Sequence, residues 1–195
     1  MIFQTCETFS SASGKKDAKT GRNWEGAVCF DPNSDKNTGY VYEIYDDSLK
    51  EDMSALIDAS ETIEHIWVYK CPISKWQLTQ LYFCHQFVVL KTNNWYWSIE
   101  KNDKHILIQR SKSLSCVRDF KYQTERRNTP VVQLSFDKGW KTMKQLIEFL
   151  YRENELNNKY NWIADNCQDF AKRIFDEFAE KRFHCKVVGT FLQFL

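Results

Sequence analysis

Residues 160–170 read YNWIADNCQDF, and the fold expected for this chain is built around that stretch. Either Asp165 or Asn166 can cap a helix that begins here, because a side-chain oxygen accepts a backbone N–H left unpaired by the first turn. With Asp165 as the cap, Gln168 stands at the third helical position and completes a capping box. Cys167 is then in the first turn of the helix.

The helix predicted after Cys167 has one apolar side, formed by Phe170, Ala171, Ile174, Phe175 and Phe178. Cys167 precedes Phe170 by three residues, so its thiol lies on the same side and faces the body of the protein. The aligned peptide dipoles at a helix N-terminus favour a thiolate, which is the nucleophilic form. The carboxylates of Asp165 and Asp169 oppose this effect. The alternative is an inert buried cysteine, which is common in proteins.

Composition places the chain among folded globular proteins. Its 195 residues fit one domain with a sizeable core, and only 6 Gly and 3 Pro argue against disorder. A net charge of +1 gives no global attraction to nucleic acid, so no nucleic-acid partner is predicted. We find no apolar run long enough for a transmembrane segment, and no secretory signal in residues 1–20.

The seven cysteines are odd in number, widely spaced and without a C-x-x-C pair. This pattern supports neither a zinc site nor a disulfide framework, and we expect no metal and no cofactor. Free thiols in a chain without a signal indicate a reducing compartment. The predicted location is cytoplasmic, with the nucleus as the alternative.

The N-terminal part begins with a segment, 1–23, that is rich in Ser, Thr, Gly and Lys from residue 8 and is expected to be mobile. A single domain is expected over 24–195. Its first half contains apolar and aromatic runs that predict strands at 27–30, 40–45 and 65–69, and a short helix at 48–60.

The middle of the chain predicts a meander of three antiparallel strands, at 81–91, 95–101 and 105–109. Asn93-Asn94 marks the first turn, and a two-residue loop there sets the register of the hairpin. In that register His85 faces Asn102, Phe87 faces Glu100 and Val89 faces Ser98, all on one face of the sheet. The helix that begins at Cys167 is expected to bury its apolar side on the face that carries His85, Phe87 and Val89.

The rest of the chain combines polar and helical segments. Residues 110–130 are basic and are interpreted as a solvated connection, or alternatively as a surface for an acidic partner. A strand is predicted at 131–136. Thr142 and Gln145 form a capping box that starts an amphipathic helix. The apolar residues 185–195 predict a final strand or a packed tail.

A nucleophilic cysteine needs a base, and the chain has four histidines. His85 is the best placed, since it lies in a strand with Phe83 and Val88–Leu90 beside it; the alternative is a core histidine with no chemical role. His65 is interpreted as a partly buried surface residue. His105 borders a turn, and His184 lies in a loop or at the start of a strand.

The sequence HQFVVL at 85–90 before a hairpin, followed by Asn166-Cys167-x-x-Phe170 at a helix start, resembles the permuted papain-like thiol hydrolases. In that superfamily the histidine strand precedes the cysteine helix. The Asn-Cys-x-x-Phe form is similar to the lecithin retinol acyltransferase-like and the PPPDE (desumoylating isopeptidase-like) branches. It is less similar to the NlpC/P60 hydrolases, in which an aspartate usually precedes the cysteine. The resemblance covers roughly residues 81–180 of the chain.

The resemblance implies an α+β, circularly permuted papain-like fold, with a central antiparallel sheet and the helix that bears the nucleophile packed on it. Carried over by position, Cys167 is the nucleophile and His85 the general base. The third polar position is Glu100, Ser98 or Asn102. Acyltransferase-like members have a second histidine there, which this chain lacks. Glu100 is preferred, because a carboxylate orients and stabilises an imidazolium.

Two functions from different classes follow. The first is a thiol hydrolase or acyl transferase that forms a thioester at Cys167, acting on a peptide, an isopeptide or an acyl lipid. The second is a catalytically inactive domain of the same fold that binds a protein through its Trp-rich sheet. The Cys/His pair favours the enzyme.

Overall fold

The computed structural model describes residues 6–8, 23–35, 41–72, 84–121, 124–125, 131–161 and 165–181. Within these ranges the protein is α+β, as predicted. Its elements, in chain order, are β1 (Cys6–Thr8), β2 (Ala27–Asp31), β3 (Val41–Tyr45), α1 (Leu49–Leu56), β4 (Ile63–Pro72), β5 (Cys84–Thr92), β6 (Tyr96–Lys101), β7 (Ile106–Ser111), α2 (Leu114–Arg118), β8 (Phe120–Lys121), β9 (Thr124–Glu125), β10 (Val132–Lys138), α3 (Met143–Arg152) and α4 (Cys167–Phe178).

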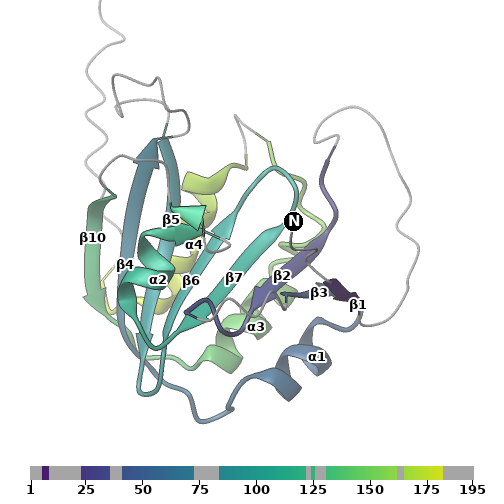
Figure 1. Ribbon diagram of the computed structural model, residues 1–195, viewed down its shortest axis with the longest axis horizontal. Coiled ribbons are helices and arrows are strands. Elements are labelled where there is room, and N and C mark those ends of the chain that lie inside the picture. Colours follow the sequence, from purple (N-terminus) through teal and green to yellow (C-terminus); the bar gives the residue numbers. More distant parts are fainter. Residues whose placement is uncertain are drawn as a thin grey trace, which may run out of the picture.

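Eight of these strands form one sheet in the order β1-β3-β2-β7-β6-β5-β4-β10 (Figure 1). The five strands from β7 to β10 pair antiparallel, and this part contains the predicted meander. The sheet as a whole is mixed, because β2 pairs parallel with β7 and β1 pairs parallel with β3. The prediction of an antiparallel sheet is therefore correct at its centre and wrong at the end that carries β2 and β1.

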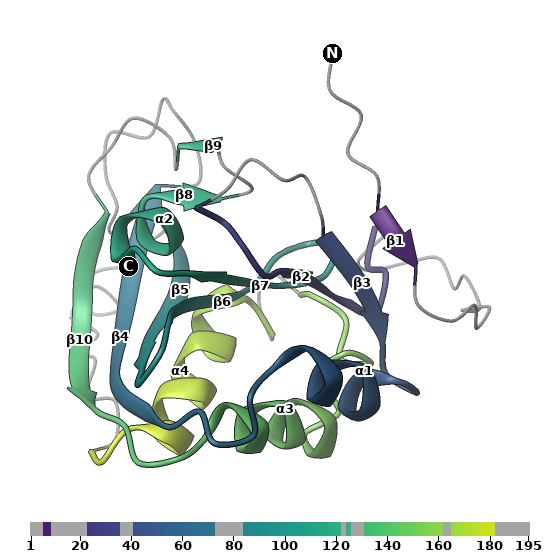
Figure 2. The ribbon, with the colours of Figure 1, turned by 60° about the horizontal axis from the view of Figure 1, so that its bottom comes forward.

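The two faces of the sheet are covered unequally. Figure 2 shows α1, α3 and α4 together on one face and α2 on the other. The larger core joins the apolar sides of those three helices to Val88, Leu90 and Trp97. The smaller core packs Phe87 and Val89 against α2. Successive residues of β5 thus alternate between two buried layers, which explains why this strand is an almost continuous apolar run.

The predicted hairpin register is confirmed where β5 and β6 pair, whereas the predicted pairs His85–Asn102 and Phe87–Glu100 lie beyond the paired residues. Val89 pairs with Ser98, and the pairing between β5 and β6 runs from Val88 opposite Ile99 to Lys91 opposite Tyr96. The loop has two residues, since the N–H of Thr92 donates to the carbonyl oxygen of Trp95 at 2.8 Å. The turn chemistry and the alternation of the strands were sufficient to set this register.

The helices depart from prediction in two places. The capping box of Thr142 and Gln145 starts α3 as expected. However, α1 ends at Leu56, earlier than predicted, because Asp58 accepts from the backbone N–H of Ser60 at 2.8 Å and forms a turn. The connection at 110–130 contains the short helix α2, which the polar composition of this region did not indicate.

Several predictions concern residues outside the described ranges. They include most of the N-terminal segment 1–23, of which residues 6–8 form β1. They also include the first residues of the run at 81–91, His184, and the apolar segment 185–195. No helix in the described part of the chain is long and apolar enough to cross a membrane.

Gly139 provides a test of the packing between the sheet edge and α4. It follows β10 and forms an isolated bridge with Ala179. Its N–H donates to the backbone carbonyl oxygen of Glu64 at 3.0 Å. A methyl group at this position would lie 2.8 Å from the carbonyl oxygen of Ile63 and would also contact the side chain of Ile63. Gly139→Ala should therefore lower the free energy of unfolding by about 2 kcal/mol, as overpacking does.

The measurement is urea denaturation followed by tryptophan fluorescence. Ser54→Ala, on the exposed side of α1, is the matched control and should change the free energy of unfolding by less than about 0.5 kcal/mol. Equal stability of Gly139→Ala and the wild type would show that the chain is not closely packed at this point.

Candidate active site

Cys167 is the first residue of α4, and Asn166 caps the helix. The side chain of Asn166 accepts from the N–H groups of Gln168 and Asp169, at 2.8 and 3.3 Å. The carboxylate of Asp169 accepts from the N–H of Asn166 at 3.2 Å and completes a capping box. Of the two predicted caps, Asn166 is thus correct. The alternative of Asp165 with Gln168 is wrong, because the carboxylate of Asp165 is held by Lys101 and Arg173.

The Cys167 sulfur lies against the backbone at the beginning of β5. Its Sγ is 3.8 Å from the carbonyl oxygen of Cys84, and it accepts a hydrogen bond from the N–H of Gln86. These two backbone groups flank His85 and point to the same edge of the strand. The paired part of β5 and β6 begins further along, at Val88. The start of α4 therefore contacts β5 at its backbone edge, ahead of the hairpin.

This placement corrects one step in the expected packing. We predicted that α4 would bury its apolar side on the face that carries His85, Phe87 and Val89. Instead, Phe170 and Ile174 pack in the larger core with Val88, on the opposite face. The His85 ring lies on the Phe87 side, with ring centroids 6.4 Å apart. The Cys167 side chain still forms a hydrogen bond with His85, because it approaches the strand at its edge.

Glu100 holds the other side of the imidazole. His85 Nε2 is 2.6 Å from Glu100 Oε2, and the Glu100 side chain is completely buried. This contact leaves Nδ1 of the ring for the thiol. The second carboxylate oxygen, Oε1, is 3.1 Å from Nζ of Lys121. The structure thus joins Cys167, His85 and Glu100 in one chain of interactions.

The other two residues considered for the third position have different surroundings. Within the described part of the chain, the buried hydroxyl of Ser98 has no hydrogen-bond partner. The Asn102 side chain accepts from the N–H groups of Lys104 and His105, at 2.8 and 3.1 Å, and so stabilises the turn between β6 and β7. Neither replaces the short contact that Glu100 makes with His85.

The electrostatics of the pair favour its charged form. Burial lowers the pKa of the His85 imidazole, but the Glu100 carboxylate and Cys167 raise it, to about 9 overall. Burial raises the pKa of the Cys167 thiol, but the hydrogen bond and positive charge of His85 bring it below its ordinary value. Below its own pKa of about 9 the imidazole is protonated. Above the lowered pKa of the thiol, Cys167 is ionised, and between these limits the two form an ion pair.

Tyr160 is a functional candidate that the sequence reading missed. Its hydroxyl donates to Cys167 Sγ at 3.9 Å and accepts a hydrogen bond from the backbone N–H of Cys167. Burial and the charge of Cys167 raise the pKa of this hydroxyl, so it stays a donor at neutral pH. Beside this contact, the backbone N–H of Asn161 donates to the carbonyl oxygen of Asp165 at 2.9 Å. No periodicity in the sequence predicts that pairing.

The two other described histidines have different neighbours. The ring of His65 packs against Trp67 and Phe136, with centroids 5.7 and 5.6 Å apart. His105 Nδ1 is 3.3 Å from Glu25 Oε2. Among the described residues, no group of three His, Cys, Asp or Glu side chains is arranged to hold a metal ion.

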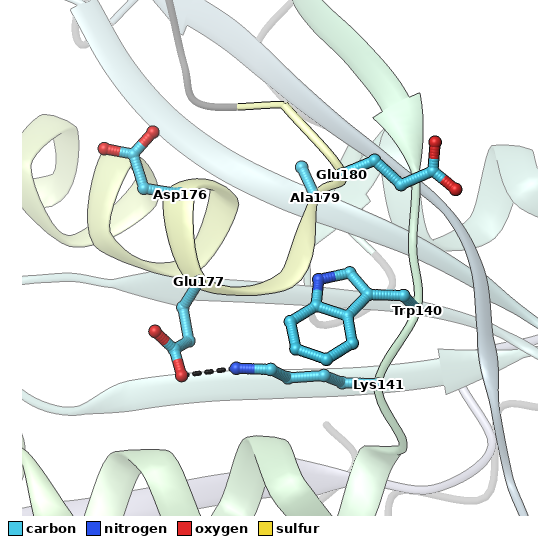
Figure 3. Close-up of a pocket in the computed structure, with 6 residues that line it drawn as sticks. All are labelled: Trp140, Lys141, Asp176, Glu177, Ala179 and Glu180. Carbon is cyan, nitrogen blue, oxygen red and sulfur yellow. Dashed lines mark hydrogen bonds and ion pairs between the residues drawn. The ribbon is translucent and has the colours of Figure 1, made fainter.

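Cys167 is nearly enclosed. The exposed fraction of Cys167 is 3%, whereas that of the His85 side chain is 18%. A cavity of about 540 Å³ is lined by Asn161, Asp165 and Arg173. A second cavity, of about 420 Å³, lies at the far end of α4, next to Trp140 (Figure 3). Neither cavity is lined by Cys167 or His85.

Comparisons of the chain with models of known protein families, with curated proteins and with solved structures found no match.

Proposed function

We propose that this protein is a cysteine-dependent hydrolase or acyl transferase. In this proposal Cys167 is the nucleophile, His85 is the general base and acid, and Glu100 orients and stabilises the imidazolium. The observation that carries it is the continuous chain from the Cys167 thiol through His85 to Glu100, with 2.6 Å between Nε2 and Oε2. A nucleophile, a base that contacts it and a third group that holds the base are the parts that thiol catalysis requires.

The first half-reaction forms a thioester. The Cys167 thiolate attacks the carbonyl carbon of the substrate, and the electron pair of the C=O bond moves to oxygen. The backbone N–H of Cys167 and the hydroxyl of Tyr160 lie beside the sulfur and are the donors that stabilise this oxyanion. As the intermediate collapses, the leaving group takes the proton of the His85 imidazolium and departs.

The second half-reaction releases the acyl group. His85, now neutral, takes a proton from water or from an acceptor amine, which attacks the thioester carbon. Cys167 leaves as a thiolate and the imidazolium is restored. With water the reaction is hydrolysis, and with an amine it is acyl transfer. The substrate is a peptide, an isopeptide or an acyl lipid, which share the reacting carbonyl.

We also infer a permuted papain-like arrangement. The histidine is carried by a strand of the central sheet, the cysteine by the first turn of a later helix, and the helix packs on that sheet. This order and placement match the resemblance that the sequence motifs suggest. The mixed character of the sheet at β2 and β1 lies outside the segment to which the resemblance applies.

The test uses p-nitrophenyl acetate, a small activated ester. The wild-type protein should release p-nitrophenol and carry a transient acetyl group, which mass spectrometry of rapidly quenched samples should locate on Cys167. Cys116→Ser is the matched control, since Cys116 is more exposed than Cys167, and it should behave as the wild type. A folded wild-type protein that is never acetylated at Cys167 would refute the enzymatic proposal.

A non-catalytic binding domain is the second candidate, and two observations favour it. Cys167 is only 3% exposed, whereas the edge of the sheet at β10 presents large aromatic side chains: Phe136 is 50% exposed and Trp140 is 60% exposed. Exposed aromatic residues are typical of protein-binding surfaces. Absence of acetylation at Cys167 would make this candidate the better account.

A further inference from the structure

A cluster of four charged side chains, two of them buried and two partly exposed, lies beside the start of α4. It consists of Lys101, Glu155, Asp165 and Arg173, and we call it the ion cluster. Lys101 Nζ is 2.5 Å from Asp165 Oδ2 and 3.3 Å from Glu155 Oε2. Arg173 contacts the same two carboxylates, each at 2.7 Å. With two positive and two negative charges the cluster is formally neutral.

Lys101 is the unusual member of the ion cluster. It is the last residue of β6, and its side chain is 0% exposed. Its ammonium group lies over the rings of Trp24 and Phe170, 5.2 and 6.0 Å from their centroids. Burying a lysine has a large desolvation cost, and a buried ion pair often stabilises a fold no better than apolar residues of similar size. The ion pairs of Lys101 are therefore weak evidence that this residue stabilises the fold.

The ion cluster fixes the segment that precedes the nucleophile. Asp165 stands immediately before the capping residue Asn166 and two residues before Cys167. Its backbone exchanges hydrogen bonds with Asn161, at 2.9 and 3.2 Å. Tyr160 precedes Asn161, and its hydroxyl lies 3.9 Å from the Cys167 sulfur. By fixing the Asp165 carboxylate, the ion cluster therefore also helps to fix the positions of Tyr160 and Cys167.

Strand β6 supports both halves of the site through consecutive residues. Glu100 and Lys101 point to opposite faces of the sheet, as neighbours in a strand do. Glu100 contacts the His85 ring, and Lys101 contacts the carboxylate of Asp165, two residues before Cys167. We propose that Lys101 is a positioning residue for the Cys167–His85 pair, acting through Asp165; this inference rests on the proposed function.

The positive charge of Lys101, like its position, favours the thiolate form of Cys167. A carboxylate two residues from Cys167 disfavours the thiolate, and Lys101 and Arg173 together offset the charge of Asp165. Among the described residues, the charged and titratable groups near the Cys167 thiol include His85 from β5, Glu100 behind it on β6 with Lys121 at its second oxygen, Tyr160 and Asp165 ahead of α4, and Asp169 in α4. Loss of the Lys101 charge changes this balance while His85 and Glu100 stay in place.

The experiment measures the rate at which iodoacetamide alkylates Cys167 as a function of pH, by mass spectrometry of the full chain. In Lys101→Met we expect the midpoint of the pH profile to rise by about one unit, and the rate at a pH well below the wild-type midpoint to fall about tenfold, because the thiolate fraction there changes tenfold per unit of pKa. Lys101→Arg keeps the charge and should keep the midpoint. In Lys101→Met/Glu155→Gln one charge of each sign is removed, so the charges that remain in the ion cluster are balanced. We expect the same fall in rate and the same rise in midpoint in this variant.

The matched control is Lys141→Met. Lys141 also pairs with a carboxylate at 2.5 Å, that of Glu177, but at the other end of α4 (Figure 3). Its removal should leave the alkylation profile of Cys167 unchanged. Circular dichroism and thermal melting establish that each variant is folded.

Three results would overturn the proposal for Lys101. One is a folded Lys101→Met/Glu155→Gln protein with the wild-type alkylation rate and midpoint. The second is an equal effect of Lys141→Met. The third is failure of both Lys101→Met and Lys101→Met/Glu155→Gln to fold, which would assign the ion cluster a structural role alone. Alkylation reports the state of the thiol whether or not the protein turns over an ester, so failure of the enzymatic proposal is read separately, from acetylation by p-nitrophenyl acetate.

Discussion

Cys167→Ala and His85→Ala should each reduce the turnover of p-nitrophenyl acetate by at least about a thousandfold, and the double variant should be no slower than either single variant. The reason is that the two side chains act as one unit. Without Cys167 there is no atom to form the thioester. Without His85, burial keeps the thiol protonated and no group transfers the proton.

The non-additivity is the informative part of this prediction. If the two residues contributed independently, the double variant would lose the product of the two single factors. His65→Ala is the matched control, because His65 packs against Trp67 and Phe136 away from the sulfur, and it should retain full turnover. Additive losses, or turnover that survives in His85→Ala, would show that the hydrogen-bonded pair is not the catalytic unit.

Glu100→Gln should also slow turnover by about a thousandfold or more near neutral pH, since amide replacement of the carboxylate in a triad has an effect of this size. Two causes add. The neutral amide no longer raises the pKa of His85 against the opposing effect of burial, so less imidazolium forms. The amide N–H of glutamine can also donate to Nε2, which would place the imidazole proton on the wrong nitrogen.

The control for this variant is Glu64→Gln. Glu64 is a more exposed carboxylate that pairs with Lys91 at 3.7 Å, and exposed pairs of this kind contribute little. Turnover and its pH profile should be unchanged in Glu64→Gln. Wild-type turnover in a folded Glu100→Gln protein would mean that the short contact between His85 and Glu100 has no part in the reaction.

Local features of this fold were predictable from sequence because they depend on neighbours in the chain. The loop at Asn93-Asn94 and the alternation of the flanking strands set the register that places Val89 opposite Ser98. The capping box at Thr142 follows from two residues three positions apart. The preference for Glu100 over Ser98 and Asn102 rested on a carboxylate being able to stabilise an imidazolium, and Glu100 is the residue that contacts His85.

Features that depend on distant partners were not predictable. The parallel pairing of β2 with β7 joins segments far apart in the chain, and no pattern within either strand indicates it. The face on which α4 packs was wrongly predicted, because both faces of β5 are apolar and periodicity cannot choose between them. Asp165 was a reasonable cap by its position, but its carboxylate is taken by Lys101, which is 64 residues away in the chain.

The most direct test of the account is the pH dependence of alkylation for every cysteine of the wild-type chain, measured with limiting iodoacetamide and mass spectrometry. The thiolate is the reactive form, so a thiol whose pKa is lowered keeps its reactivity as the pH falls. We expect Cys167 to be labelled first near neutral pH in spite of its burial, and its profile to move to higher pH in His85→Ala. Preferential labelling of Cys116 with Cys167 untouched, or a Cys167 profile that is identical with and without His85, would contradict the thiolate–imidazolium pair on which the proposed function rests.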